Sequence, residues 1–266
     1  MASYIIIVEG YTDCALIEAI IEKSLGFQLY KKKNEMPEIF QALVNEYPSA
    51  GGDLKRSDTP HFFYKGDKKI AVKAAGGESN IAMKVENALQ AADVVEKEDI
   101  DRFLVFVDKD RHKKLNEIEK LLKDWYQERG ITFDIEKNTV SLYEKEYLHY
   151  VYAYPENRTG TVEKILLEIG GKIYPNLMHI AENTRAAVFD EQFDDLRSKK
   201  WSKNVEVQEF YGDKVQIGTL ASILKPDRPI GYAIKDEIIK TKYLTELDKV
   251  EEFRKLQDFL KSNIDN

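Results

Sequence analysis

Two short apolar runs, each followed by acidic residues, dominate the hydrophobic pattern of the chain. Residues 5–8 read Ile-Ile-Ile-Val, and residues 103–107 read Phe-Leu-Val-Phe-Val. Uninterrupted apolar runs of this length, rich in β-branched residues, are typical of strands buried on both faces of a sheet. From Ala15 to Leu25 the apolar positions recur at helical spacing. The pattern therefore predicts a buried strand followed by a helix over roughly residues 13–25.

Further apolar segments predict the rest of an α/β fold. We expect a central, mainly parallel sheet flanked by helices, with its strands near residues 4–8, 69–74, 102–107 and 147–154. The segment 102–107 is expected at the centre of the sheet because it is the most continuously apolar. Residues 61–64 and 69–73 flank the sequence Lys65-Gly-Asp-Lys68, which predicts a hairpin with a tight turn. Alternating apolar positions between Phe133 and Leu142 resemble a further strand pattern.

The segmentation of the chain suggests two regions. Residues 1–180 are expected to form the α/β domain, and residues 27–68 an insertion between the first helix and the second core strand. Residues 181–266 are expected to be mainly helical, with an apolar stripe that includes Phe253 and Leu256.

Acidic residues stand where the two most apolar strands end. Glu9 follows the first strand, Gly10 permits a tight turn, and Thr12 or Asp13 can cap the helix that follows. Asp108 and Asp110 follow the second strand and are one residue apart, so they point the same way if the strand geometry continues. Ligands of open parallel sheets bind at this edge. Crowded carboxylates repel one another and a hard divalent cation neutralises them, so a metal site is expected here.

Two further features are candidates for contact with phosphate. Gly76 and Gly77 lie between a strand and a helix, where a glycine pair lets the backbone approach a phosphate closely; the alternative is that they only form the turn. Basic residues follow the Asp-x-Asp sequence. Those expected to contact nucleic acid are Lys109, Arg111, Lys113 and Lys114, and the alternative is a solvated basic surface.

Composition limits the function classes. The 266 residues carry 40 Lys and Arg against 47 Asp and Glu, a formal charge of −7, so bulk charge does not favour nucleic-acid binding. The chain has one cysteine, Cys14, and no apolar run of the length that spans a membrane, so we expect a cytoplasmic protein without a membrane partner. There is no nucleophile-elbow sequence, no zinc-type spacing and no Walker sequence.

The acidic motifs resemble those of the TOPRIM domain, which topoisomerases, bacterial primases, ribosomal-RNA maturation nucleases and the overcoming-lysogenisation-defect (OLD) nucleases share. The resemblance rests on Val8-Glu-Gly-Tyr-Thr-Asp13 and Val107-Asp-Lys-Asp110, each at the end of an apolar strand and in the same order. Thr159-Gly-Thr-Val-Glu163 further resembles the Gly-x-x-Glu of small TOPRIM proteins related to the OLD nucleases. Outside the acidic motifs the resemblance is loose, although it continues through Asp213-Lys214 to residues 222–233.

The resemblance implies a TOPRIM, Rossmann-like fold and a set of site residues. The metal ligands it implies are Glu9, Asp13, Asp108, Asp110 and Glu163, which would hold Mg²⁺ or Mn²⁺. Glu9 either belongs to the metal site or acts as the general acid/base. A lysine of the C-terminal region stabilises the scissile phosphate in the related nucleases; Lys214 and Lys225 both fit, and Lys214 is preferred as the second catalytic residue.

The implied function is metal-dependent hydrolysis of DNA or RNA, in phage defence or nucleic-acid repair. The alternative is a non-catalytic TOPRIM-fold binding or sensor module that works with a partner protein. The expected partner is therefore a nucleic acid, and a partner ATPase and a homodimer are left open. Any ATPase activity would have to come from such a partner, because the chain lacks a Walker sequence.

Overall fold

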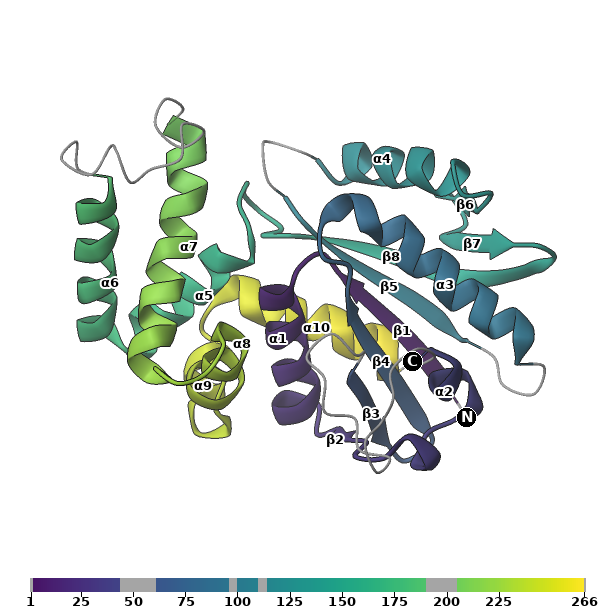
Figure 1. Ribbon diagram of the computed structural model, residues 1–266, viewed down its shortest axis with the longest axis horizontal. Helices are drawn as coiled ribbons and strands as arrows, with labels where there is room; N and C mark the ends of the chain where they lie inside the picture. Colours follow the sequence, from purple (N-terminus) through teal and green to yellow (C-terminus); the bar gives the residue numbers. More distant parts are fainter. Residues whose placement is uncertain (1, 44–60, 96–99, 110–113, 190–204, 266) are drawn as a thin grey trace.

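The protein folds around one sheet of eight strands with helices on both faces (Figure 1). The structure is a computed structural model that describes residues 2–43, 61–95, 100–109, 114–189 and 205–265. The strand order is β2-β3-β4-β1-β5-β8-β7-β6. The α/β class expected from the sequence is confirmed.

The four central strands are the four that the apolar pattern predicted. They are β4 (Lys68–Ala74), β1 (Ala2–Val8), β5 (Arg102–Asp108) and β8 (Lys145–Tyr154), and they lie side by side. All three pairings among them are parallel. Their carboxyl ends therefore meet at one edge, and β5 lies near the centre of the sheet as expected.

The prediction of a mainly parallel sheet is wrong for the sheet as a whole, which is mixed. On one side β3 (His61–Lys65) pairs antiparallel with β4, and β2 (Gln28–Leu29) pairs antiparallel with β3. On the other side β7 (Thr139–Leu142) pairs antiparallel with β8, and β6 (Thr132–Asp134) with β7. The pairs β3–β4, β6–β7 and β7–β8 are hairpins, which join neighbouring strands of opposite direction, whereas β2 pairs with β3 across a long stretch of chain that includes α2. The predicted hairpin β3–β4 is confirmed.

Helices follow or precede most strands and cover both faces of the sheet. The helices that begin before residue 181 are α1 (Tyr11–Ala19), α2 (Glu38–Leu43), α3 (Ile81–Val94), α4 (Leu115–Gln127), α5 (Val162–Ile173) and α6 (Pro175–Val188). Those after it are α7 (Val205–Leu224), α8 (Ile230–Ala233), α9 (Leu244–Leu247) and α10 (Glu251–Asp265). Short π-helical turns extend α1 over Ile20–Ser24 and α8 over Ile234–Ile238. None of the helices described is long and apolar enough to cross a membrane.

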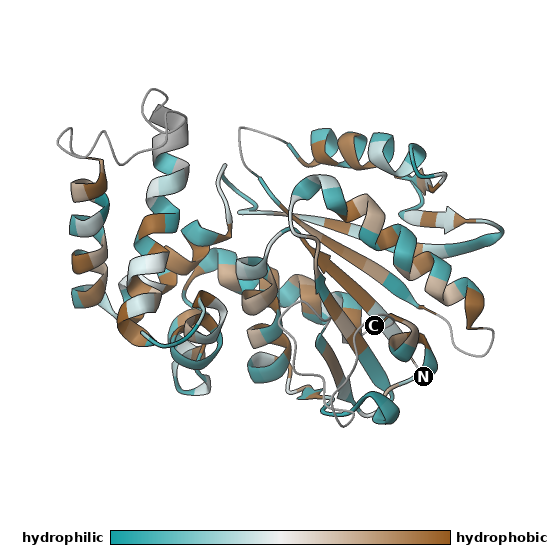
Figure 2. Cartoon of the chain, viewed as in Figure 1, coloured by the Kyte–Doolittle hydropathy of each residue, from teal (hydrophilic) through white to brown (hydrophobic). Residues whose placement is uncertain are grey.

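Strand β1 shows why the sheet is covered on both sides. Ile5 and Ile7 belong to the hydrophobic layer that includes α2, α3 and α4, whereas Ile6 and Val8 belong to the layer that includes α1, α5 and α10. Side chains alternate along a strand, so an uninterrupted apolar run feeds both layers. Figure 2 shows the central strands as the apolar middle of the molecule.

The end of helix α10 lies beside the amino ends of strands β1 and β5. The Tyr4 hydroxyl donates a hydrogen bond to the Ile264 carbonyl at 3.0 Å, and the Arg102 guanidinium donates to the Asn263 carbonyl at 2.9 Å. The two ends of the chain therefore lie near each other (Figure 1). The division of the chain near residue 180 stays a prediction. Helix α5, which carries the predicted acidic residue Glu163, packs against α6 and α7 beyond the carboxyl ends of the central strands.

Candidate functional site

Glu9 and Asp108 meet at the carboxyl ends of the adjacent strands β1 and β5. These strands are parallel, with Val8 opposite Phe106, so the residues that follow them emerge at one edge. The Asp108 amide donates a hydrogen bond to Glu9 Oε2 at 3.3 Å. Glu9 is half-buried and Asp108 is buried. The predicted convergence of these two acids is present in the structure.

Asp13 is held at the start of helix α1 by two donors. The Gly10 amide donates to Asp13 Oδ2 at 3.0 Å, and the Tyr154 hydroxyl donates to Asp13 Oδ1. A Cβ atom on Gly10 would lie 2.9 Å from Asp13 Oδ2, a contact that real Cβ atoms avoid. Gly10 has an extended backbone, so it is needed for this close approach of the carboxylate rather than for an unusual turn conformation.

Glu163 lies in the first turn of helix α5 and is buried. The preceding amide, that of Val162, donates a hydrogen bond to Asp108 Oδ1 at 2.8 Å. The positive end of helix α5 is therefore directed at the carboxyl end of β5, where it favours negative charge. We call the four residues Glu9, Asp13, Asp108 and Glu163 the acidic edge.

Lys214, on helix α7, pairs with the acidic edge. Its ammonium nitrogen lies 2.7 Å from Glu163 Oε1, and its side chain is 43% exposed, against 4% for Glu163. The other Glu163 oxygen, Oε2, is buried and has no hydrogen-bond partner among the described residues. Helices α5 and α7 pack together and so bring this lysine to the edge from a distant part of the chain.

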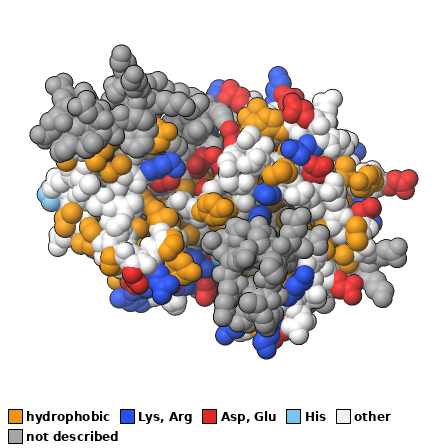
Figure 3. Space-filling view, viewed as in Figure 1, with side chains coloured by type: hydrophobic (Ala, Val, Ile, Leu, Met, Phe, Trp, Pro, Cys, Tyr) orange, Lys and Arg blue, Asp and Glu red, His pale blue; other side chains and the backbone are white. Residues whose placement is uncertain are grey.

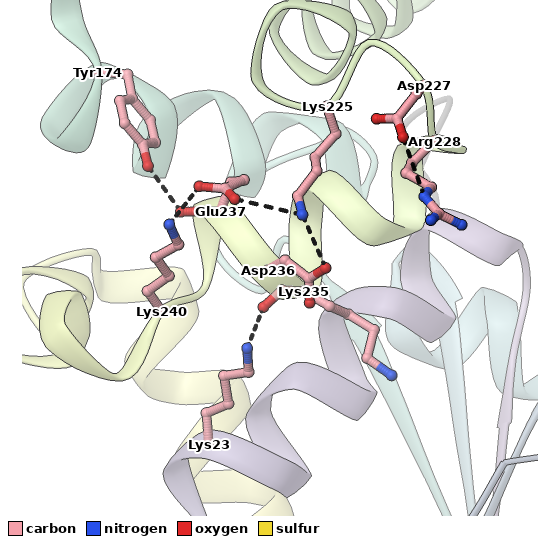
Figure 4. Close-up of polar contacts among 9 residues, drawn as sticks. All are labelled: Lys23, Tyr174, Lys225, Asp227, Arg228, Lys235, Asp236, Glu237 and Lys240. Carbon is pink, nitrogen blue, oxygen red and sulfur yellow. Dashed lines mark hydrogen bonds and ion pairs between the residues drawn. The ribbon is translucent and has the colours of Figure 1, made fainter.

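Lys225, the other lysine considered, belongs to a different ion-pair network. It directly follows helix α7, and its ammonium is 3.4 Å from Asp236 Oδ2 and 3.7 Å from Glu237 Oε1 (Figure 4). Glu237 also pairs with Lys240 in the same network. The structure therefore brings Lys214, and not Lys225, into contact with the acidic edge.

Burial and mutual repulsion shift the pKa values of the acids at this edge. Burial raises the pKa of Asp13 to about 6, and Glu163 adds to the rise while the Tyr154 hydrogen bond opposes it. Burial also raises the pKa of Asp108 well above its ordinary value, and the charges of Asp13, Glu9 and Glu163 raise it further. Ionising these carboxyls in the folded protein therefore costs free energy that a cation would recover.

The Lys214 ammonium responds to the same charges with the opposite sign. Burial lowers the pKa of Lys214, but the Glu163 carboxylate, followed by Asp108 and Asp13, raises it by more, so the net pKa shift is upward. Because three acids of the edge contribute, the ammonium compensates the group as a whole and not only its direct partner.

A pH dependence of stability follows from the raised pKa of Asp13. A carboxyl whose pKa moves from 3.8 in the unfolded chain to about 6 in the folded protein binds its proton more tightly when folded, so its contribution to stability is lost as pH rises through that window. We expect Asp13→Asn, which lacks this titration, to gain in melting temperature relative to the wild type between about pH 4 and about pH 7, with metal chelated. Thermal denaturation of both proteins across this range checks it. A difference that does not change with pH would contradict the raised pKa.

The glycine pair that was expected to bind phosphate makes a contact within the protein. The Gly76 and Gly77 amides both donate to the Glu9 carbonyl oxygen at 3.0 Å. The two glycines also have positive φ angles, 77° and 127°, that other residues rarely adopt. In this conformation the pair fixes the backbone of Glu9, and its amides point at that carbonyl rather than outward.

The basic residues after β5 are only partly described. The Lys109 ammonium donates to the Glu156 carbonyl, and its backbone forms a bridge with Gly160. Lys114 is exposed at the start of helix α4. Asp110, Arg111 and Lys113 lie outside the described residues.

The grouping of the acidic side chains determines whether they could ligate a metal ion as they stand. Within the described part of the chain, no three histidine, cysteine, aspartate or glutamate side chains are gathered so as to hold a metal ion. Each acid of the edge instead accepts a hydrogen bond from the protein: from the Asp108 amide, the Gly10 amide with Tyr154, the Val162 amide or Lys214. A cation would therefore have to draw these side chains inward.

Tyr154 is a site residue that the sequence analysis missed. It is the last residue of β8, it is buried, and its hydroxyl orients Asp13. The sequence could have indicated this residue, because it ends the predicted strand β8, which is parallel to β5 and ends at the same edge of the sheet. On the face seen in Figure 3, basic and acidic side chains are interspersed over the described surface.

Residues 3–264 match the family described as "Protein of unknown function (DUF3226)". No curated protein matches the chain significantly. Among solved structures, the chain is similar to the "Crystal structure of hypothetical protein PH0156 from Pyrococcus horikoshii OT3", with 16% sequence identity, a TM-score of 0.48, and coverage of 96% of this chain and 99% of that one. Similarity at that level carries no argument about the site. The family match extends over nearly the whole sequence, and the chain therefore belongs to the DUF3226 family.

Proposed function

We propose that this protein is a metal-dependent nuclease of the TOPRIM type that hydrolyses phosphodiester bonds in DNA or RNA. The observation that carries the proposal is the ion pair of 2.7 Å between Glu163 and Lys214. It connects a residue of the loosely similar C-terminal region to the acids at the ends of β1 and β5. The four parallel central strands support the TOPRIM, Rossmann-like part of the proposal.

The chemistry of the acidic edge fits Mg²⁺ or Mn²⁺. All four side chains offer carboxylate oxygens, which these hard cations prefer. The buried Glu163 Oε2 atom, which has no hydrogen-bond partner among the described residues, is available to a cation. When bound, the cation would orient a water molecule and stabilise the charge that develops on the leaving oxygen of a phosphodiester.

The residues of the chain would divide the remaining tasks. Glu9, half-buried at the end of β1, either transfers a proton as general acid/base or contributes to the metal site. Tyr154 and Gly10 orient Asp13, and the N-terminus of helix α5 favours anionic groups beside Asp108. Lys214 would supply a positive charge to the phosphate. We place this activity in the cytoplasm, where a single free cysteine such as Cys14 stays reduced.

A second candidate is a binding or sensor module without catalytic activity. It is favoured by the hydrogen bonds that every acid of the edge already accepts from the protein, and by the absence of a ready three-ligand group among the described residues. In that case the cation would hold a phosphate ligand or a partner protein in place, and no bond would be cleaved.

Incubation of the protein with plasmid, single-stranded DNA and RNA separates the two candidates. We expect cleavage of at least one substrate with Mg²⁺ or Mn²⁺ and none with EDTA, because the acids need the cation to act. Asp108→Asn, purified in the same way, controls for contaminating nucleases and should be inactive. A wild-type protein that binds Mn²⁺ but cleaves none of the three substrates would favour the binding module and end the nuclease proposal.

A further inference from the structure

Lys214 occupies the position at which a metal cation would compensate the acidic edge. Its ammonium is 2.7 Å from Glu163 Oε1, and the charges of Asp108 and Asp13 also stabilise it. The second oxygen of the buried Glu163 carboxylate, Oε2, has no hydrogen-bond partner among the described residues and can accept another donor or bind a cation. An ammonium and a divalent cation that share one carboxylate repel each other, since both are positive and lie a few ångströms apart.

The side chain of Lys214 can move away from Glu163. The Lys214 side chain is partly exposed, whereas Glu163 is buried in the first turn of helix α5. A lysine carries its charge on a flexible four-carbon chain, so the ammonium can move several ångströms while helix α7 stays in place. When a cation binds, we therefore expect the Lys214 ammonium to move and the Glu163 carboxylate to stay in place.

We propose that Lys214 is an exchangeable counter-cation: it pairs with Glu163 in the metal-free protein, and binding of Mg²⁺ or Mn²⁺ displaces its ammonium outward, toward the position of the substrate phosphate. This inference rests on the proposed function and adds an order of events to it. The metal would separate the Lys214 ammonium from Glu163 and bring it toward a polyanion, so phosphate binding at Lys214 becomes dependent on the metal. In the metal-free protein the same pair keeps a buried carboxylate compensated.

The first test is the affinity of the protein for Mn²⁺ alone, measured by calorimetry. Lys214→Met removes the competing charge and keeps the length of the side chain, so we expect Mn²⁺ to bind about fivefold more tightly or better, at the lower end of typical coupling between two ligands. Lys225→Met is the matched control, because it removes a paired lysine that directly follows helix α7 and belongs to a different ion-pair network, and it should leave the affinity unchanged. In a Glu163→Gln background, Lys214→Met should give no further gain.

The second test uses the wild-type protein and does not depend on the folding of a variant. Competitive acetylation followed by mass spectrometry measures how readily each lysine reacts. We expect Lys214 to be protected by Glu163 without metal and to react faster when Mn²⁺ is added, while Lys225 shows no change. Unchanged reactivity of Lys214 at saturating Mn²⁺ would overturn the proposal.

The outcomes distinguish this inference from the nuclease proposal. Metal-dependent cleavage by the wild type, together with equal or weaker Mn²⁺ binding by Lys214→Met, overturns the exchange and leaves the nuclease intact. Tighter binding by Lys214→Met, with Mn²⁺-dependent exposure of Lys214 but no cleavage, supports the exchange and ends the nuclease. Absence of Mn²⁺ binding to both proteins overturns both.

Discussion

Glu9→Gln is expected to lower the nicking rate by about 10²- to 10⁴-fold, the contribution typical of general acid–base catalysis. Glutamine has the size of glutamate and retains an oxygen that accepts the hydrogen bond from the Asp108 amide. It loses the negative charge and the ability to exchange a proton. The backbone around residue 9 should not change, because the Gly76 and Gly77 amides bind its carbonyl oxygen and not its side chain.

The measurement is the initial rate of plasmid nicking under saturating Mn²⁺, with folding and nucleic-acid binding checked in parallel. Glu252→Gln is a suitable control. Glu252 is also buried, and it accepts hydrogen bonds from backbone amides, those of Glu156 and Asn157, but it lies outside the acidic edge. Its replacement should leave the rate within a few-fold. A Glu9→Gln protein that cleaves like the wild type would end the nuclease assignment in its present form, even if Asp108 binds metal.

The central strands could be predicted because their signal is local. A run such as residues 103–107 must be buried on both sides wherever it is placed, and the β3–β4 hairpin is encoded in its turn. The sheet was predicted to be mainly parallel, and this was wrong for its edge strands. The direction of an edge strand depends on the strand with which it pairs. Strand β2 has only two residues, Gln28 and Leu29, both exposed, so no hydrophobic pattern marks it.

The candidate site could be predicted only in part, for the same reason. Glu9, Asp13 and Asp108 follow from strand ends, because parallel strands place their carboxyl ends together. The choice between Lys214 and Lys225 could not be made from the sequence. Lys214 lies within helix α7 and Lys225 directly follows its last residue, and only the packing of that helix against α5 decides which one reaches Glu163.

The glycine pair and Tyr154 show the limits of motif arguments. A Gly-Gly turn between a strand and a helix looks the same in the sequence whether its amides bind a phosphate or a carbonyl, and in the structure Gly76 and Gly77 bind the carbonyl of Glu9. Tyr154 looks like any other aromatic residue of a strand rich in tyrosines until its hydroxyl is seen to donate to Asp13.

Asp108→Asn is expected to separate metal affinity from stability, because the two should change in opposite directions. Asparagine keeps an oxygen that accepts the hydrogen bond from the Val162 amide, so the start of helix α5 stays anchored. It removes a charge that burial and three neighbouring acids make costly, which is why the pKa of Asp108 is raised. The metal-free variant should therefore be at least as stable as the wild type at neutral pH, since a carboxyl with a raised pKa destabilises the folded protein once it is ionised.

Binding of Mg²⁺ or Mn²⁺ to Asp108→Asn should weaken by at least about 10- to 100-fold, the loss typical for residues that merely support a metal ligand. Calorimetric titration and thermal denaturation of the same samples measure both effects. Asp134→Asn provides a control of opposite sign. Hydrogen bonds from the Lys137 and Glu136 amides lower the pKa of Asp134 at the end of strand β6, so this variant should lose a little stability and bind metal normally. Equal metal affinities of Asp108→Asn and the wild type would show that Asp108 is not a ligand, and the acidic edge would then have to be explained as a buried network that Lys214 alone compensates.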